Sequence, residues 1–423
     1  MSNAVHPWRV LVSGALTVVM AGALPAASSP HEPSYAQIGL YSDGVVLDPD
    51  GMPREVPVGD RDLADDPVRR AEQDAWLAHG TIPGPPEYAD LAEQALRDLD
   101  ALVLSGGAAL AGASPGWQYV WPRDASFTAA ALARTGHPQD AHAVLAYLQS
   151  MQDARSTAGV FEARYLPDGT GDVPDDRGLQ LDGSGWVLWA VSQWYKATPA
   201  GSARAADLEA LRPLVVRSVA AIRAHVDGDG LPFAFPDFWE VDVELPTLGT
   251  LAPLLLGVRA AAPLLAALDE PPASDLVVLL SRGLQEHFAP DYPRWLGGQD
   301  QDGAVAFLMP PFAPPDEEVR AAWLEAQAGM SRPAGGLAPG TGWRLDGVSW
   351  TPTTALFALT AAASGDVDLA RERLDWLAAH RTERGSLPEK VLWDGSPSAV
   401  APLAWTCALV LLALDELDRQ SAA

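Results

Sequence analysis

Apolar residues recur with helical spacing along most of this chain. Two series illustrate the pattern: Leu276, Leu280, Leu284 and Phe288 lie four positions apart, and Leu403, Cys407, Val410, Leu414 and Leu417 follow the i, i+4, i+7 rule. Residues 251–268 and 355–363 are instead apolar almost throughout. A stripe predicts a helix with one buried face, whereas an apolar helix is covered on both sides.

Helical blocks of these two kinds number about a dozen between residues 86 and 420, and clusters of Gly, Pro and Asp end them. Alternating strand patterns are almost absent there. The contrast between striped and apolar blocks predicts two concentric layers of helices. We therefore expect an all-α protein whose residues 86–420 form an (α/α)6 toroid, a barrel of six helical hairpins. A helical bundle or a solenoid is the alternative, and the lack of a fixed repeat period disfavours the solenoid.

Two segments precede the helical blocks. Residues 1–28 contain an apolar run from Val10 to Leu24, shorter than the roughly 20 residues of a spanning helix, with a small-residue cleavage site near Ala23. This pattern predicts a signal and an extracellular or cell-envelope protein; the alternative is an uncleaved tail on a cytoplasmic protein. Residues 29–85 predict an irregular leader with short β-branched pieces such as 44–47. No other stretch reads as a membrane span.

Charge and composition narrow the class of function. The chain has 28 Lys plus Arg against 55 Asp plus Glu, a net charge of −27, so nucleic acid and anionic membranes are poor partners. A neutral or cationic substrate fits better. The single Cys407 excludes an intrachain disulfide. The eight histidines show no metal-ligand spacing, and no dinucleotide or phosphate-binding motif is present, so we expect no metal and no cofactor.

Two short motifs match known patterns by chance. Residues 112–116 fit the G-x-S-x-G pattern of a serine nucleophile, but the residue after Ser114 is Pro115, which has no N–H for an oxyanion. Residues 227–230 begin like a calcium loop but lack its later ligands. Any chemistry is therefore expected from carboxylates.

Polar loops with tryptophans and acids interrupt the helical blocks. They are residues 117–124, 180–186, 236–240 and 385–389, the last followed by Trp393 and Trp405. Tryptophan faces pack against sugar rings, and carboxylates with guanidinium groups bind sugar hydroxyls. Taken singly, these residues could equally be helix caps, a surface ion pair and solvated glutamates. The four loops together, in this order along the chain, form a pattern that is specific enough to indicate a family.

The ordered loops resemble the glucoamylase family, family 15 of the glycoside hydrolases, from about residue 85 to residue 418. The resemblance implies that Tyr119, Trp121, Arg123 and Asp124 hold the terminal glucose, with Gln180, Asp182 and Gly183 in a second matching segment. In the third segment, Trp239 precedes Glu240, which corresponds to the general acid. Glu389 corresponds to the general base, and Trp405 follows it. Arg294, before Asp302, resembles a family arginine near the sugar, and Trp350 resembles a family aromatic residue. The resemblance implies that the following residues also bind the substrate: Gln180, Asp182, Trp239, Arg294 and Trp405.

Inversion at a sugar carbon needs an acid and a base roughly 6.5 to 9.5 Å apart, with a water between the base and the ring. We therefore expect Glu240 to lie against apolar surface, which would keep it protonated, and Glu389 to be hydrated or paired with a cation. The sequence departs from the family pattern after the acid. Val241 stands where a second carboxylate is common, and Asp242 and Glu244 are the nearest replacements.

The resulting hypothesis is an inverting exo-acting α-glucoside hydrolase that releases glucose from the non-reducing ends of malto-oligosaccharides or dextrins. Hydrolysis of trehalose or isomalto-oligosaccharides on the same scaffold is the second reading. A non-catalytic glucan-binding toroid is the third. In each case the partner is an oligosaccharide. The sequence does not indicate the oligomeric state of the protein.

Overall fold

Most of the described residues lie in two layers of helices. The structure, a computed structural model, describes residues 35–155 and 157–422; the predicted signal segment 1–28 lies outside them. Six inner segments contact one another in a closed ring, each touching the next and the last touching the first. In ring order they are α3 (Pro122–Arg134), α5 (Asp182–Ala197), α8 (Leu248–Ala267), η2 (Gly303–Leu308), α11 (Thr351–Ala363) and α13 (Ala404–Ala422).

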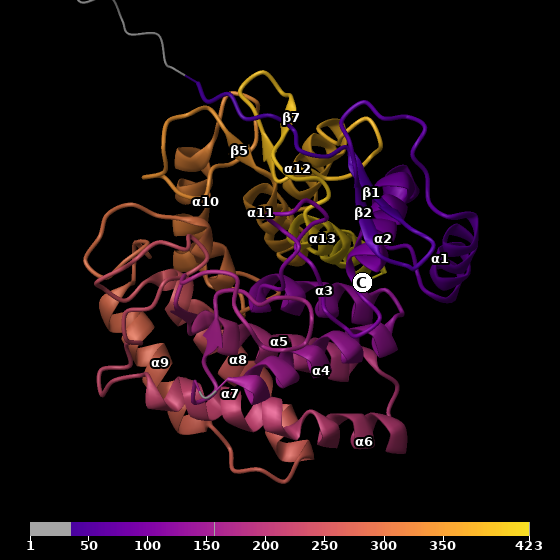
Figure 1. The fold of residues 1–423 in the computed structure, drawn as a ribbon. Coiled ribbons are helices and arrows are strands. Elements are labelled where there is room, and N and C mark those ends of the chain that lie inside the picture. Colours follow the sequence, from indigo (N-terminus) through magenta and orange to yellow (C-terminus); the bar gives the residue numbers. More distant parts are fainter. Residues whose placement is uncertain (1–34, 156, 423) are drawn as a thin grey trace, which may run out of the picture. The chain divides into compact units, whose positions relative to one another are not determined.

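Outer helices alternate with the inner segments along the chain and pack against them from outside. They are α2 (Ala89–Leu102), α4 (Pro138–Ala154), α7 (Arg212–Ala224), α9 (Ser274–His287), α10 (Glu317–Met330) and α12 (Val367–Ala379). The short α6 (Ser202–Ala210) precedes α7, and η1 (Pro86–Tyr88) precedes α2. The six inner–outer pairs form the predicted (α/α)6 barrel, with α3, α5, α11 and α13 in the middle of the view in Figure 1.

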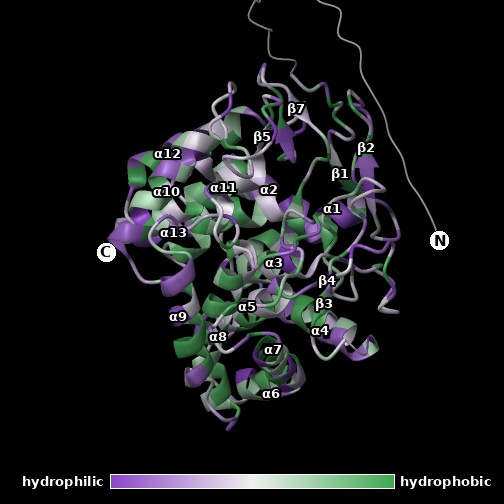
Figure 2. Ribbon diagram, turned by 90° about the vertical axis from the view of Figure 1, so that its left-hand side faces the viewer, coloured by the Kyte–Doolittle hydropathy of each residue, from purple (hydrophilic) through white to green (hydrophobic). Residues whose placement is uncertain are grey.

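Burial separates the two layers, as the hydrophobic pattern predicts. The inner α11 buries every residue from Thr351 to Ala362, whereas the outer α9 buries only Leu276, Leu280 and Gly283. Figure 2 shows α8 largely in the green of hydrophobic residues. Among the described residues, α8 is long and apolar enough to span a membrane, a match that the sequence analysis did not expect. However, 67% of its most apolar window is buried in the barrel, which identifies it as a core helix.

Small and aromatic side chains shape the inside of the barrel. A Cβ atom at Gly185 would overlap the carbonyl of Pro253, so glycine lets α5 and α8 approach closely. An interior aromatic cluster fills the space between the inner helices; its members are Phe127, Trp186, Trp189, Phe307 and Phe312. Because these rings are almost fully buried, the barrel is a packed core and not a channel.

The fourth inner segment is much shorter than the others. η2 is a 3-10 helix of six buried residues, capped by Asp302, whose Oδ1 accepts a hydrogen bond from the amide of Ala304 at 3.0 Å. Pro310 and Pro311 follow it closely, and proline cannot continue a helix because it lacks an amide N–H.

The leader is more regular than predicted. β1 (Gly44–Leu47), which covers the predicted β-branched piece, pairs antiparallel with β2 (Pro53–Val56). The helix α1 (Pro67–His79) follows, although the sequence analysis expected irregular structure there. Its start is well defined, because the carboxylate of Asp66 accepts hydrogen bonds from the amides of Val68 and Arg69.

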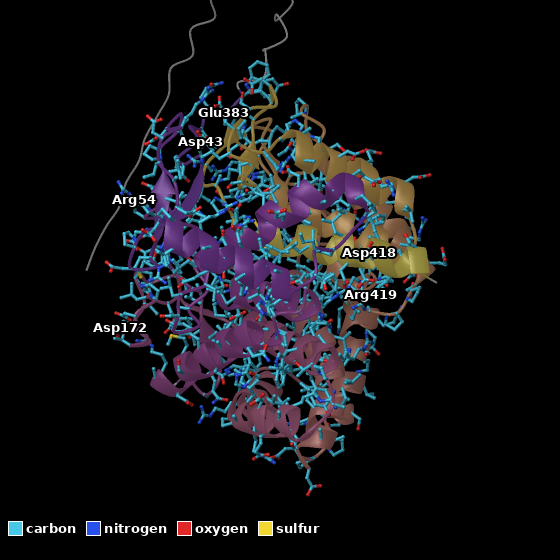
Figure 3. The ribbon with its side chains drawn as sticks, turned by 90° about the vertical axis from the view of Figure 1, so that its right-hand side faces the viewer. Asp43, Arg54, Asp172, Glu383, Asp418 and Arg419 are labelled. Carbon is cyan, nitrogen blue, oxygen red and sulfur yellow. The ribbon has the colours of Figure 1, made fainter. Side chains whose placement is uncertain are left out.

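Residues 39–43 of the leader bind to the segment between α12 and α13. Tyr41 donates its amide hydrogen to the carbonyl of Ala399 at 2.8 Å, and Ala399 donates back to Gly39 at 2.9 Å. The hydroxyl of Thr382 donates to the carbonyl of Asp43 at 2.5 Å. Figure 3 accordingly shows Asp43 and the neighbouring Glu383 at the same end of the molecule. The N-terminal part of the described chain therefore supports a C-terminal loop.

Two small sheets order the loops around the barrel. β3 (Phe161–Glu162) pairs with β4 (Leu179–Gln180), and β6 (Lys390–Val391) lies between β5 (Ser349–Trp350) and β7 (Pro397–Ser398). All pairings are antiparallel.

Candidate active site

A cavity of about 450 Å³ lies at the end of the barrel where α3, α11 and α13 begin. Most of the predicted site residues line it: Trp121, Arg123, Asp124, Trp239, Glu240, Glu389 and Trp405. Trp117, Phe238, Trp343 and Trp350 add further aromatic surface. The structure therefore brings residues from three of the four predicted loops to one cavity.

Glu240 stands at the end of a tight turn. Its amide donates to the carbonyl of Asp237 at 2.8 Å, and the amide of Trp239 donates to Oδ1 of Asp237 at 3.0 Å. Glu240 has a φ of +53°, in the left-handed region that costs a side-chain-bearing residue roughly 1–2 kcal/mol. Such strain is held by the surroundings and is common at functional sites.

A buried ionic cluster holds this turn in place. Arg294 donates through Nη1 and Nη2 to the two oxygens of Asp237, both at 3.1 Å, and through Nη1 to Asp302 at 2.9 Å. Its guanidinium also stacks on Trp239, 3.8 Å from the ring centroid. Arg294 is 2% exposed and does not line the cavity. It lies behind the turn, although the sequence analysis expected it to bind sugar.

Glu389 is held by backbone hydrogen bonds on both sides. Its amide donates to the carbonyl of Val400 at 2.8 Å, and its carbonyl accepts from the amide of Thr351 at 3.0 Å. The carboxylate is buried, and burial raises its pKa, while Lys390, whose Nζ lies 3.2 Å from Oε2, opposes that shift. The ammonium of Lys390 lies 4.2 Å from the ring centroid of Trp350.

Arg123 and Asp124 form a buried ion pair at the cavity wall. Nη2 of Arg123 donates to Oδ2 of Asp124 at 2.9 Å, and the guanidinium lies 4.5 Å from the ring centroid of Trp405. Burial raises the pKa of Asp124, and the charge of Arg123 counteracts the shift. In the described part of the chain, Nε and Nη1 of Arg123 have no hydrogen-bond acceptor.

Three predicted sugar-binding residues stand behind the cavity wall. Tyr119 packs under the guanidinium of Arg164, Gln180 donates to the carbonyl of Asp237 at 3.3 Å, and Asp182 accepts from the indole of Trp186 at 3.2 Å. Burial raises the pKa of Asp182 to about 7. None of the three lines the cavity, in contrast to the sequence expectation.

Arg164, Arg177 and Trp343 also line the cavity, although they belong to none of the predicted sequence motifs. The two arginines flank residues 165–176, in the loop before the predicted 180–186 segment. A charged residue three positions before Gln180 is a weak signal, because charged loop residues are usually solvated. Trp343 packs edge-on against Trp239, with ring centroids 4.6 Å apart. The high tryptophan content of the chain, 15 residues, is the one sequence feature that points to it.

The environments of the two glutamates differ from those expected. Glu240 was expected against apolar surface, yet its Oε1 accepts from the indole of Trp121 at 2.5 Å and its Oε2 pairs with Arg177. The cation partner expected for Glu389 is present in Lys390, but Glu389 is also the more buried of the two side chains, 12% exposed against 15%. Glu240 has a polar and not an apolar environment because Arg177, from the preceding loop, reaches its carboxylate.

Comparisons with known proteins agree with this architecture. No family model matches the chain. The chain is 26% identical over 343 residues to an isomaltose glucohydrolase of Kribbella flavida, an alignment that covers 71% of this chain and 84% of the relative. A wild-type glycosidase structure superposes with a TM-score of 0.63 at 25% identity, over 84% of this chain and 99% of that one.

Two glucoamylase structures share the fold at lower identity. A bacterial glucoamylase in complex with acarbose has a TM-score of 0.64 at 14% identity, over 84% of this chain and 60% of that one. The glucoamylase of Saccharomycopsis fibuligera has a TM-score of 0.60 at 14% identity, over 75% of this chain and 90% of that one. The chain has the glucoamylase fold. It is similar to glycoside hydrolases in sequence and structure, and these similarities support hydrolysis of a glycosidic bond as its activity.

Proposed function

We propose that the protein is an inverting, exo-acting hydrolase that releases glucose from the non-reducing ends of short α-glucosides. One observation carries the proposal: the predicted acid Glu240 and the predicted base Glu389 line the same tryptophan-rich cavity. The cavity volume is within the range of small-molecule sites. The packed aromatic cluster of the barrel supports an exo mode, because a long glucan cannot thread through a filled core.

Each step of inversion has a residue to carry it. Glu240 donates a proton to the glycosidic oxygen as the bond from that oxygen to C1 breaks, and the leaving alcohol departs neutral. A water attacks C1 from the opposite face, and Glu389 takes its proton. The product is β-glucose. Arg123 and Asp124 bind the glucose hydroxyls, because a buried guanidinium–carboxylate pair offers charged donors and acceptors together.

The linkage has two candidates. The sequence pattern favours α-1,4-linked malto-oligosaccharides, and the similarity to an isomaltose glucohydrolase favours α-1,6-linked isomalto-oligosaccharides. We place isomaltose first, because the residues after Glu240 do not supply the second carboxylate common in the malto-oligosaccharide enzymes that the sequence resembles. Val241, Asp242 and Glu244 do not line the cavity.

Proton NMR of fresh reaction mixtures tests the proposal. Isomaltose, maltose and trehalose are incubated separately with the full chain, and the first-formed anomer of glucose is recorded before mutarotation. We expect β-glucose, released fastest from isomaltose. Release of α-glucose would overturn the inverting mechanism. Absence of hydrolysis in all three, with sugar binding retained, would favour the non-catalytic alternative.

A further inference from the structure

Two arginines occupy the part of the cavity next to the predicted acid. Arg164 and Arg177 both line the cavity, and both donate to the carboxylate of Asp175. Arg177 also pairs with Oε2 of Glu240 through Nη1. Because Glu240 marks where the glycosidic oxygen must lie, this part of the cavity is the side from which the leaving group departs.

Arg164 is fixed, whereas Arg177 has hydrogen-bonding capacity left. Arg164 donates through Nε and Nη2 to Asp175 and through Nη1 to the carbonyl of Gly116, and it stacks on Trp121 with its guanidinium 4.9 Å from the ring centroid. Within residues 35–155 and 157–422, no hydrogen-bond acceptor contacts Nη2 of Arg177. Its side chain is 37% exposed, so an incoming ligand can reach it.

Catalysis changes the charge balance on this side. An acid must carry its proton before it can give it away, and a protonated Glu240 no longer balances the charge of Arg177. Asp175 is then the single carboxylate in contact with both guanidinium groups among the described residues. The carboxylates nearest to Glu240 in sequence, Asp242 and Glu244, do not line the cavity. One positive charge is therefore left for the leaving group.

We propose that the leaving-group side of the cavity binds an anionic aglycone, whose carboxylate pairs with Arg177 beside Glu240. The inference rests on the α-glucosidase activity proposed above and names its substrate class. The carboxylate of the substrate accepts the hydrogen bond that Arg177 otherwise gives to Glu240. Oε2 of Glu240 can then hold the proton that passes to the glycosidic oxygen. Arg177 thus selects the substrate and releases the acid for catalysis.

The test compares three α-glucosides of similar size. They are the α-D-glucosides of glycolate, of glycolamide and of ethane-1,2-diol, all with a primary-alcohol leaving oxygen as in isomaltose. The quantity measured is kcat/KM for the full chain. Because a hydrogen bond to a charged group is stronger than one to a neutral group, we expect kcat/KM to be about ten- to a hundredfold higher for the glycolate glucoside than for the neutral glycolamide glucoside. The preference should shrink at high salt because the pair is partly exposed.

Variants locate the preference at one residue. Arg177→Gln should lower the ratio of kcat/KM for the glycolate glucoside to kcat/KM for the glycolamide glucoside to about one. Arg177→Lys should keep part of the preference. Arg217→Gln is the matched control, because Arg217 on α7 is likewise a partly exposed arginine in a salt bridge, here with Asp153, but does not line the cavity. It should keep the full ratio. Circular dichroism and thermal melting check that each variant is folded.

The outcomes separate this inference from the proposed function. If the glycolate glucoside is cleaved no better than the amide, the anionic subsite is overturned, while hydrolysis of either leaves the proposed function standing. If Arg177→Gln keeps the preference, the assignment to Arg177 is overturned. If none of the three, nor isomaltose or maltose, is hydrolysed, the proposed function itself fails.

Discussion

The two predicted catalytic glutamates are held by different physical means. Glu240 ends a tight turn and itself has a left-handed backbone, and the ionic cluster of Asp237, Arg294 and Asp302 fixes that turn. Glu389 adjoins a three-stranded sheet, with both its amide and its carbonyl in backbone hydrogen bonds. Charges therefore position the first glutamate, and main-chain geometry positions the second.

This difference suits the roles proposed for them. A general acid has to change its hydrogen-bond partners during the reaction, and Glu240 has two that can be exchanged, Trp121 and Arg177. A general base has to keep a water in line with C1, and a rigid backbone serves that need. Substitutions that remove charged partners should therefore disturb the position of Glu240. Substitutions near Glu389 should instead act through the pKa of its carboxyl group.

The largest effect is expected from removing either carboxylate. Glu240→Gln and Glu389→Gln should each lower kcat on isomaltose by about 10²–10⁴-fold, because each removes a proton-transfer group. α-Glucosyl fluoride separates the roles, since fluoride leaves without much help from an acid. Glu240→Gln should recover activity on it and Glu389→Gln should not. The exposed Glu244→Gln is the control, and the reverse recovery pattern would exchange the two assignments.

Next in size is the effect of the ionic cluster on stability. Arg294→Met leaves the buried Asp237 and Asp302 without their cation, and breaking a buried ion pair in this way costs about 3–5 kcal/mol. Urea unfolding followed by fluorescence measures the loss. Arg259→Met is the control, because Arg259 is exposed and, among the described residues, its side chain bonds only Ser281, so its change should stay within about 0.5 kcal/mol. Equal stability of both variants would contradict the role of the cluster.

A smaller effect is expected from the indole that bonds the acid. Trp121→Phe keeps an aromatic face but removes the donor to Oε1 of Glu240, and should lower kcat by about ten- to a hundredfold with little change in KM. Trp76→Phe removes a comparable bond, from the indole to Asp140 at 2.9 Å, outside the cavity. That control should leave kcat unchanged. A rise in KM alone for Trp121→Phe would indicate a purely sugar-binding role.

The smallest effect is a shift in pH dependence. A base acts in its ionised form, so activity falls as pH drops through the pKa of Glu389, which burial has raised. Lys390 opposes that rise, and Lys390→Met should therefore move the acidic limb of kcat/KM to higher pH. Lys390→Arg keeps the charge and should leave the limb in place. An unchanged limb in Lys390→Met would show that Glu389 does not control it.

The hydrophobic pattern was sufficient to predict the barrel but not its exceptions. Residues 251–268 and 355–363 were predicted as helices covered on both sides, and they match α8 and α11 closely. The helix α1 was missed because it buries only Gln73 and Leu77, one of which is polar. η2 was missed because six residues are too few to show a helical period.

The candidate site, like the barrel, could be predicted from the sequence only where a motif or a periodic pattern was present. Trp121, Arg123, Glu240 and Glu389, which the motif order groups, line one cavity, because each lies at the start of a helix or in a loop at one end of the barrel. Spacing could not show on which side of its loop Arg294 lies, and tertiary packing places it behind Trp239. Arg177 belongs to no periodic pattern, so only the fold reveals that it reaches Glu240.

The hydrogen bonds between residues 39–43 and the segment before α13 have a practical consequence. A shortened chain that starts after residue 43 would keep every barrel helix and both glutamates. It would nevertheless expose the carbonyl of Ala399 and remove the acceptor of Thr382, in the segment that also carries Glu389. Loss of turnover without loss of helical content is therefore the expected sign of over-trimming, and expression design should retain the chain from Tyr35 onward.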